Sequence, residues 1–402
     1  MSTTEQSIRH PERLINFEEA RSRHGAKADF MAEMLQVGDP LADAVIVEMD
    51  ELGKEARRFI NAGLADGLDS LTDPPPAIAA WLRHLETVPE WVDRAALEAG
   101  EVGYLSINPL WASLAEVSSK LSDVYASPPI AKLLVQTGPL AKMAPRRLAE
   151  TGMWQAQTRA PGGLLRGAPG YVQTAQVRLL HARVRATSLK HGWNSEQWGV
   201  PINQVDLART WLDFTVVPQL AMEKLGIVFG DEEQHAIYRY WWYIAHLLGL
   251  DERFYLEYGN NTQALVLKDL LDVTIAEPDE NSRLLTEAQL DAGADILAAG
   301  QLGMDKPVVR DLLNGLLRYF HGDELADGLG VPPSQTTPLI PLLVAACAQA
   351  WHVQRSTPEG AAQALREHTV GNLAITVGEL PGGGASSYEK HAEDADTAAS
   401  SA

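Results

Sequence analysis

The spacing of apolar residues constrains this chain more than any other feature of its sequence. From about Phe30 onward, apolar residues recur at steps of three and four, which is the period of a helix with one buried face. Strand-like alternation of apolar and polar residues is scarce. Because 46% of the residues are apolar, such helices can bury a sizeable core. The sequence therefore predicts an all-α fold.

Proline and glycine divide the helical pattern into segments. We expect turns at the proline clusters 74–76, 128–129 and 332–333, a loop over 162–170 before a long helix, and an acidic break at 278–281. The last stretch is rich in Gly, Ser, Ala and Asp and lacks the apolar content to fold. The predicted organisation is an N-terminal arm (1–29), a single helical domain (30–378) and a disordered tail (379–402).

The charge balance excludes some partners. Lys and Arg number 33 against 53 Asp and Glu, a formal net charge of −20, which repels phosphate backbones and anionic membrane surfaces. We therefore expect no nucleic-acid partner. No uninterrupted apolar stretch is long enough for a membrane span, and the first residues lack an apolar signal region. The expected location is cytoplasmic, or secreted if a signal segment has been trimmed.

Familiar catalytic signatures are missing. The single cysteine, Cys347, lies in an apolar run and is expected to be a small core residue. The sequence has no nucleophile elbow, zinc helix or phosphate loop. One Glu-x-x-His pair, Glu232 and His235, is too little for a di-iron bundle, which needs two such pairs and two further glutamates.

The segment 174–188 reads as a helix with few breakers. Val177, Leu180, His181 and Val184 fall on one stripe, which predicts that His181 faces the core. A buried imidazole is usually either hydrogen-bonded structure or a ligand. Both interpretations stay open, and an apolar wall beside a histidine on a rigid helix is the setting that a haem iron needs.

Cationic and hydroxyl groups accompany this histidine. Arg178 and Arg185 lie three residues before and four residues after it, so either could reach the propionates of a haem, or they are solvated helix charges. In the segment 146–155, Arg147 and Thr151 share a helix face. They could polarise oxygen at a metal or form an ordinary side-chain contact.

These motifs together carry a family resemblance. Arg147-x-x-x-Thr151, followed about thirty residues later by His181-Ala-x-Val-Arg185, resembles the latex-clearing rubber oxygenases and their relatives, including the fungal oxygenase that shortens a prenyl side chain in mycophenolic acid synthesis. The stretches 201–208 and 241–250 are also similar to the family. The resemblance spans roughly residues 111 to 250.

The resemblance implies a globin-like helical core with additional helices around a b-type haem. His181 would be the proximal iron ligand, and Arg147 and Thr151 would lie beside bound dioxygen. The reaction would insert dioxygen across a carbon–carbon double bond of polyisoprene or another apolar isoprenoid and yield two carbonyls. Peroxidase-like or gas-binding haem proteins, and a helical binding module without cofactor, are the alternatives. The oligomeric state stays open.

One departure from the family concerns the residue before Thr151. Some rubber oxygenases have a lysine there that can occupy the sixth iron position, whereas this chain has Glu150, a candidate acid–base group. Glu116 is a further candidate carboxylate. His246 is expected to be a hydrogen-bonded core histidine, with a distal group or a second axial ligand as the alternatives. Met153 and Trp154 are either pocket lining or core.

Overall fold

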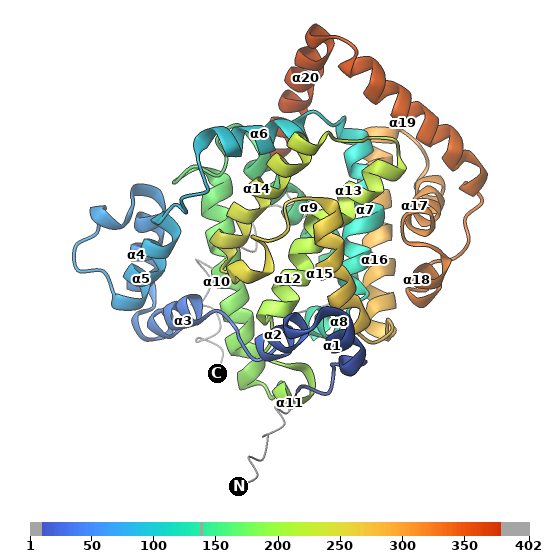
Figure 1. The fold of residues 1–402 in the computed structure, drawn as a ribbon. Helices are drawn as coiled ribbons and strands as arrows, with labels where there is room; N and C mark the ends of the chain where they lie inside the picture. The colour runs from blue at the N-terminus through green and yellow to red at the C-terminus, as the bar shows by residue number, and fades with distance from the viewer. Residues whose placement is uncertain (1–9, 137–139, 379–402) are drawn as a thin grey trace.

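The computed structural model describes residues 10–136 and 140–378, and within these ranges the chain forms helices and no strand (Figure 1). This confirms the predicted fold class. The predicted tail, 379–402, lies outside the described residues. The first ten α-helices are α1 (Phe17–His24), α2 (Ala26–Met34), α3 (Pro40–Leu52), α4 (Lys54–Asp66), α5 (Pro76–Glu86), α6 (Arg94–Leu105), α7 (Pro109–Tyr125), α8 (Pro128–Gln136), α9 (Leu140–Arg159) and α10 (Pro169–Lys190). The remaining ten are α11 (Ser195–Trp198), α12 (Gln204–Phe214), α13 (Val216–Lys224), α14 (Asp231–Leu248), α15 (Asn261–Val273), α16 (Glu280–Leu297), α17 (Lys306–His321), α18 (Asp323–Gly328), α19 (Ile340–Arg355) and α20 (Pro358–Thr376).

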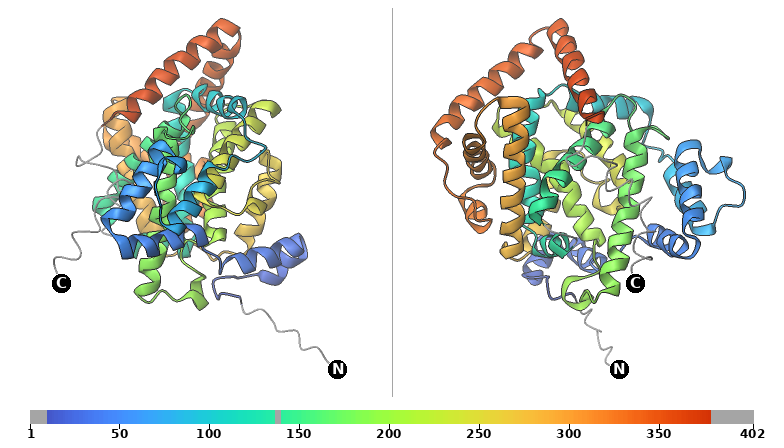
Figure 2. Two further views of the ribbon diagram at one scale, coloured as in Figure 1. Left: turned by 90° about the vertical axis from the view of Figure 1, so that its left-hand side faces the viewer. Right: turned by 180° about the vertical axis from the view of Figure 1, so that it is seen from behind.

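Long helices form the centre of the molecule. Helices α7, α9, α10, α12, α14 and α16 pack on one another and carry most of the buried aromatic side chains. Helices α3 to α5 stand at one side of this bundle, and α17 to α20 cover the other side (Figures 1 and 2). The rings of Trp154, Phe214 and Trp241, from three different helices, meet at centroid distances of 5.8 to 6.2 Å. Trp154 is therefore part of the core.

The helix boundaries follow local chemistry. The proline clusters fall in turns as expected: Pro76 is the first residue of α5 and Pro128 the first of α8. At the start of α3, the Asp39 carboxylate accepts a hydrogen bond from the backbone N–H of Ala42. Asp279 caps α16 in the same way, which places the acidic break at a helix start. These helix starts can be predicted from the sequence, because each capping side chain contacts a backbone group within four residues of it.

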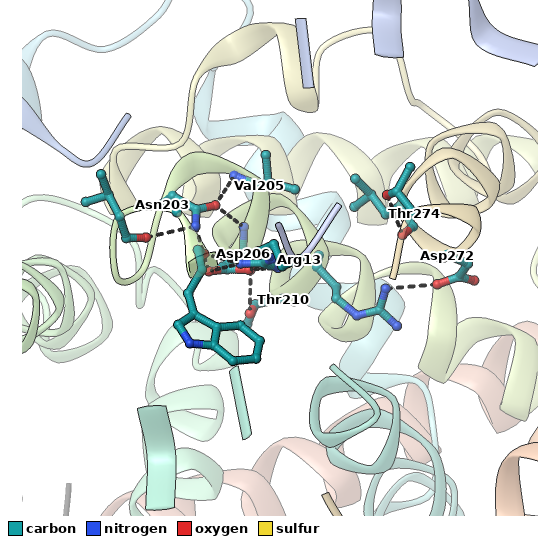
Figure 3. A network of polar contacts seen from close by, with 12 residues as sticks. Arg13, Asn203, Val205, Asp206, Thr210, Asp272 and Thr274 are labelled. Atoms are coloured by element: carbon teal, nitrogen blue, oxygen red, sulfur yellow. Dashed lines mark hydrogen bonds and ion pairs between the residues drawn. The ribbon is translucent and has the colours of Figure 1, made fainter. Parts of the chain in front are cut away.

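The described part of the N-terminal arm is docked on the bundle. Arg13 forms a two-point ion pair with Asp206 of α12, at 2.7 and 3.1 Å, and Asn203 donates a further hydrogen bond to the same carboxylate (Figure 3). Ala20 and Ala28 are completely buried. The boundary at residue 29 stays a prediction, although helix α2 runs across it.

Two further expectations concern single features. Cys347 is completely buried, and burial raises the pKa of its thiol to about 12, so its predicted place in the core is confirmed. Within residues 10–136 and 140–378, none of the helices combines the length and the apolar character that crossing a membrane requires.

Candidate functional site

Helices α9 and α10 form an antiparallel pair whose register is fixed by two contacts. Near the connecting loop, Gly170 lies against Thr158, so closely that a Cβ atom at Gly170 would be 2.6 Å from the Thr158 Cα. One turn further along both helices, the indole N–H of Trp154 donates a hydrogen bond to the hydroxyl of Thr174 at 2.9 Å. Continuing the same register by two more turns brings Arg147 to the level of His181.

The imidazole of His181 has an unsatisfied nitrogen. Its Nδ1 atom is buried and has no hydrogen-bond partner among the described residues, while the residue as a whole is half-buried. Burial, reinforced by the positive charge of Arg185, lowers the pKa of His181 to about 4. The ring is therefore neutral at neutral pH, which is the form that binds a metal. A buried nitrogen without a partner is costly, so a ligand at this ring would relieve that cost.

The sequence prediction for the stripe that carries His181 holds only in part: Val177 is buried, whereas Leu180, His181 and Val184 are half-buried. The most deeply enclosed residues of this part of α10 are Ala175, Arg178, Leu179, Ala182 and Arg185. The helix therefore turns two arginines inward and leaves an apolar stripe partly uncovered. The reason is that both arginines find carboxylates at the start of α3.

Arg178 forms a buried two-point ion pair. Its Nε and Nη2 atoms donate to the Asp39 carboxylate at 2.6 and 2.9 Å, and its Nη1 donates to the backbone oxygen of Leu247 at 3.4 Å. Gly249 leaves room for the pair, since a Cβ atom there would lie 2.6 Å from the Arg178 Nε. All three guanidinium nitrogens have protein partners. The expected contact of Arg178 with a haem propionate stays a prediction, and this geometry gives it no support.

Arg185 is held in a similar way. Its Nε donates to Asp43 at 3.1 Å and its Nη1 to the backbone oxygen of Ile202 at 3.2 Å. Burial raises the pKa of the Asp43 carboxyl and the charge of Arg185 opposes that rise. The Nη2 atom is buried without a hydrogen-bond partner among the described residues. Arg185 thus keeps one donor for a bound group, and its predicted cofactor contact stays open.

The facing segment of α9 carries the three other predicted residues. Arg147 and Thr151 are both half-buried, and Arg147 donates to the backbone oxygen of Leu134 in α8 at 3.4 Å. Glu150 is buried, and its carboxylate accepts from Arg146 at 2.9 Å. The side chain that replaces the family's lysine is therefore tied into an ion pair on its own helix.

Glu116 is unsuited to act as a base. Lys120 and Arg159 each contact its carboxylate at 2.8 Å. Burial alone would raise the pKa of Glu116, but these two cations lower it to about 2. No sequence pattern singles out Arg159, since it lies 43 residues away on α9. The four-residue spacing of Glu116 and Lys120 is the one signal that could have revealed part of this cluster.

His246 and His235, the two other histidines considered from the sequence, contact different neighbours. The ring of His246 stacks on His84 of α5 with a centroid distance of 4.5 Å. Burial, with the nearby His84 and Arg178, lowers the pKa of His246 to about 4. Its Nε2 atom is buried without a hydrogen-bond partner among the described residues, so the ring lies in the core while its expected hydrogen-bonded role stays a prediction. His235 contacts the backbone oxygen of Gly259 at 3.3 Å.

A cavity of about 810 Å³ opens beside the half-buried stripe of α10. Its lining residues come from α8, from the second half of α10 and from the segment that follows it: Lys132, Gln136, Leu180, Arg183, Val184, Thr187, Ser188, His191, Gly192, Trp193, Asn194, Gln197 and Trp198. His181 is not one of these lining residues, but it directly follows Leu180 and lies one turn from Val184, which both are.

Residues 100–351 match the family model described as the catalytic domain of the ER-bound oxygenase mpaB/B' and rubber oxygenase. The chain belongs to this family. In this rubber oxygenase family member, His181 and Arg147 both lie within the matched region. The family assignment confirms the resemblance read from the Arg147 and His181 motifs.

Two individual proteins show the same relationship. The rubber oxygenase of Streptomyces sp. (strain K30) is 24% identical over 289 residues, which covers 71% of this chain and 67% of that protein. The structure of latex clearing protein in the closed state matches with a TM-score of 0.60 and 20% identity, over 84% of this chain and 91% of that one. This family member thus shares the fold of latex clearing protein.

Proposed function

We propose that this protein is a haem-dependent dioxygenase that cleaves a carbon–carbon double bond of an apolar, isoprenoid-like substrate. The observation that carries the proposal is the neutral, unpartnered imidazole of His181, set at the level of Arg147 by the register of α9 and α10. Membership of an oxygenase family supplies the reaction class.

The residues present fit a b-type haem. His181 would hold the iron through a neutral ring nitrogen, as in globins and peroxidases. Arg185 keeps one buried guanidinium nitrogen free of hydrogen bonds among the described residues, so it is the better candidate of the two arginines for a propionate. When bound, the haem would supply activation of dioxygen.

The facing residues would stabilise charge. Arg147 offers N–H donors and a positive field, and Thr151, one turn away, offers a hydroxyl that can donate to an oxygen atom. Dioxygen contributes one oxygen atom to each carbon of the alkene, the bond between these carbons breaks, and two carbonyl groups result. Arg178 and Asp39 act at a distance, because they fix α10 and hence the direction of His181.

The first test of the proposal is the absorption spectrum of the purified protein. We expect a Soret band and haem that acid–acetone extracts. His181→Ala should abolish most haem binding, whereas His352→Ala, at an exposed position on α19, should leave it unchanged. Full haem occupancy and an unaltered spectrum in His181→Ala would show the ligand assignment to be wrong.

The second test concerns the reaction. Incubation with polyisoprene or shorter isoprenoids should give carbonyl products only when dioxygen is present, with label from ¹⁸O₂ in both new carbonyl groups. Dependence on hydrogen peroxide would identify peroxidase-like chemistry instead. A colourless, folded protein after expression with ample haem would favour a helical binding module.

A further inference from the structure

The cavity beside α10 differs in charge from the rest of the molecule. The whole chain has a formal net charge of −20, yet no Asp or Glu occurs among the described residues that line this cavity. The cationic lining residues are Lys132 and Arg183. Grouped cations in a hollow raise the local concentration of anions, and here they do so against the field of an acidic protein. The cavity therefore favours an anionic ligand.

The cations are only weakly committed to protein partners. Arg183 pairs with Asp50 through one nitrogen at 2.5 Å, but the Asp50 side chain is 61% exposed, and exposed pairs contribute little. The ammonium of Lys132 lies 5.6 Å from the ring centroid of Trp198. A carboxylate entering the cavity can compete for both groups, because neither is locked in a buried ion pair like that of Arg178.

Part of the remaining wall is apolar and aromatic, and the rest is polar, formed by Gln136, Thr187, Ser188, Asn194 and Gln197. Leu180 and Val184 are half-buried on α10, and Trp193 and Trp198 also line the cavity. The Trp193 ring is held in place by a hydrogen bond from its Nε1 to the backbone oxygen of Gly199 at 2.8 Å. Such walls suit a long hydrocarbon or isoprenoid body rather than a small inorganic anion.

The cavity is lined in part by α10, which carries His181, and by α8, which contacts Arg147. Its apolar residues occupy the turn of α10 that carries His181, and Lys132 lies on α8, whose Leu134 accepts the hydrogen bond from Arg147. A ligand whose charged end contacts Lys132 and Arg183 would have its apolar body directed along Leu180 and Val184.

We propose that this cavity binds the carboxylate end of an unsaturated, isoprenoid-like acid, and that such an acid, rather than an uncharged polymer, is the substrate class of this protein. Lys132 and Arg183 would hold the carboxylate, and the indoles of Trp193 and Trp198 would cover the chain. This inference rests on the proposed oxygenase function for its reaction, but the binding itself does not require turnover.

The test compares an acid with its uncharged ester. Binding of farnesoic acid and of methyl farnesoate to the purified full-length protein is measured by isothermal titration calorimetry, with haem content read from the Soret band. We expect the acid to bind at least tenfold more tightly than the ester. Lys132→Met combined with Arg183→Met should weaken acid binding at least tenfold, leave ester binding unchanged and retain haem. Arg58→Met, on the exposed face of α4, is the matched control for loss of a positive charge.

Three results would overturn the proposal: equal affinity for acid and ester, unchanged acid binding in the double variant, or loss of haem in that variant. The last would show that the cations hold the propionates of the cofactor instead. Circular dichroism establishes that each variant is folded. If the protein binds the acid but contains no haem, the substrate-binding inference stands while the proposed oxygenase function fails.

Discussion

The indole N–H of Trp154 donates to the Thr174 hydroxyl across 2.9 Å, and this hydrogen bond joins the helix of Arg147 to the helix of His181. Both residues are buried, and Thr174 in turn donates to the backbone oxygen of Gly170. A side-chain bond between neighbouring helices specifies their relative position along the axis, which apolar contacts alone leave adjustable. The candidate oxygen site therefore depends on a contact two turns away from it.

Thr174→Val should destabilise the protein by about 1–3 kcal/mol, because the Trp154 N–H stays buried without an acceptor. Chemical denaturation measures the loss. Trp154→Phe removes the donor as well, and the double variant should lose less than the sum of the two single variants. Additive losses would mean that the hydrogen bond does not couple the helices.

Arg178→Leu should cost about 3–5 kcal/mol of stability, since it leaves the Asp39 carboxylate buried without its partner. The matched variant is Arg183→Leu, on the same helix, whose partner Asp50 is largely exposed, and it should cost about 1 kcal/mol or less. Urea unfolding of both proteins decides the point. Similar losses in the two variants would contradict the structural role assigned to Arg178.

Asp123 and Asp213 form a buried carboxyl pair with unequal roles. Burial and the neighbouring Asp123 hold the pKa of Asp213 well above its usual range, which favours its protonated form, while Lys268, at 2.9 Å, and Arg209 hold the pKa of Asp123 low despite its burial. Asp213→Asn, which stays neutral, should change stability by less than about 1 kcal/mol, whereas Asp123→Asn should cost about 3 kcal/mol. Thermal unfolding at pH 7 compares them, and the reverse order would refute the assignment.

Glu101 should make stability depend on pH. Burial raises the pKa of this carboxyl to about 7, although the backbone N–H of Gly162 donates to it. Between its ordinary pKa and about 7 the folded state binds more protons than the unfolded state, so stability falls as pH rises through this window. In Glu101→Gln, the free energy of unfolding should therefore fall by about 1 kcal/mol less over this pH window than in the unmodified protein. The melting temperatures of both proteins at pH 5 and pH 8 measure it, and parallel changes would show that Glu101 does not contribute.

Glu150→Gln separates a structural role from an acid–base role. Because the Glu150 carboxylate is buried against Arg146, the substitution should lower stability by about 1–3 kcal/mol while turnover per bound haem stays within twofold. Product formation at fixed haem content, together with denaturant unfolding, gives both quantities. A more than tenfold loss of turnover with intact haem would support the acid–base role that the sequence suggested.

Much of the fold is specified by short-range features of the sequence. The apolar steps of three and four predict the helices, prolines such as Pro76 and Pro128 mark their starts, and the order of Arg147, Thr151 and His181 indicates the family. Each of these signals acts over a turn or two of chain, or is a motif that can be recognised without knowing what surrounds it.

The tertiary structure decided which face of α10 lies inside. The apolar periodicity predicted that the stripe with His181 faces the interior, because an apolar pattern places arginines on the exposed face of a helix. Arg178 is enclosed because Asp39, 139 residues earlier in the chain, neutralises it, and Arg185 is enclosed beside Asp43. A local pattern contains no information about a partner that distant. For the same physical reason, the sequence alone could not reveal that Leu180 and Val184, together with Lys132 and Arg183, line an open cavity.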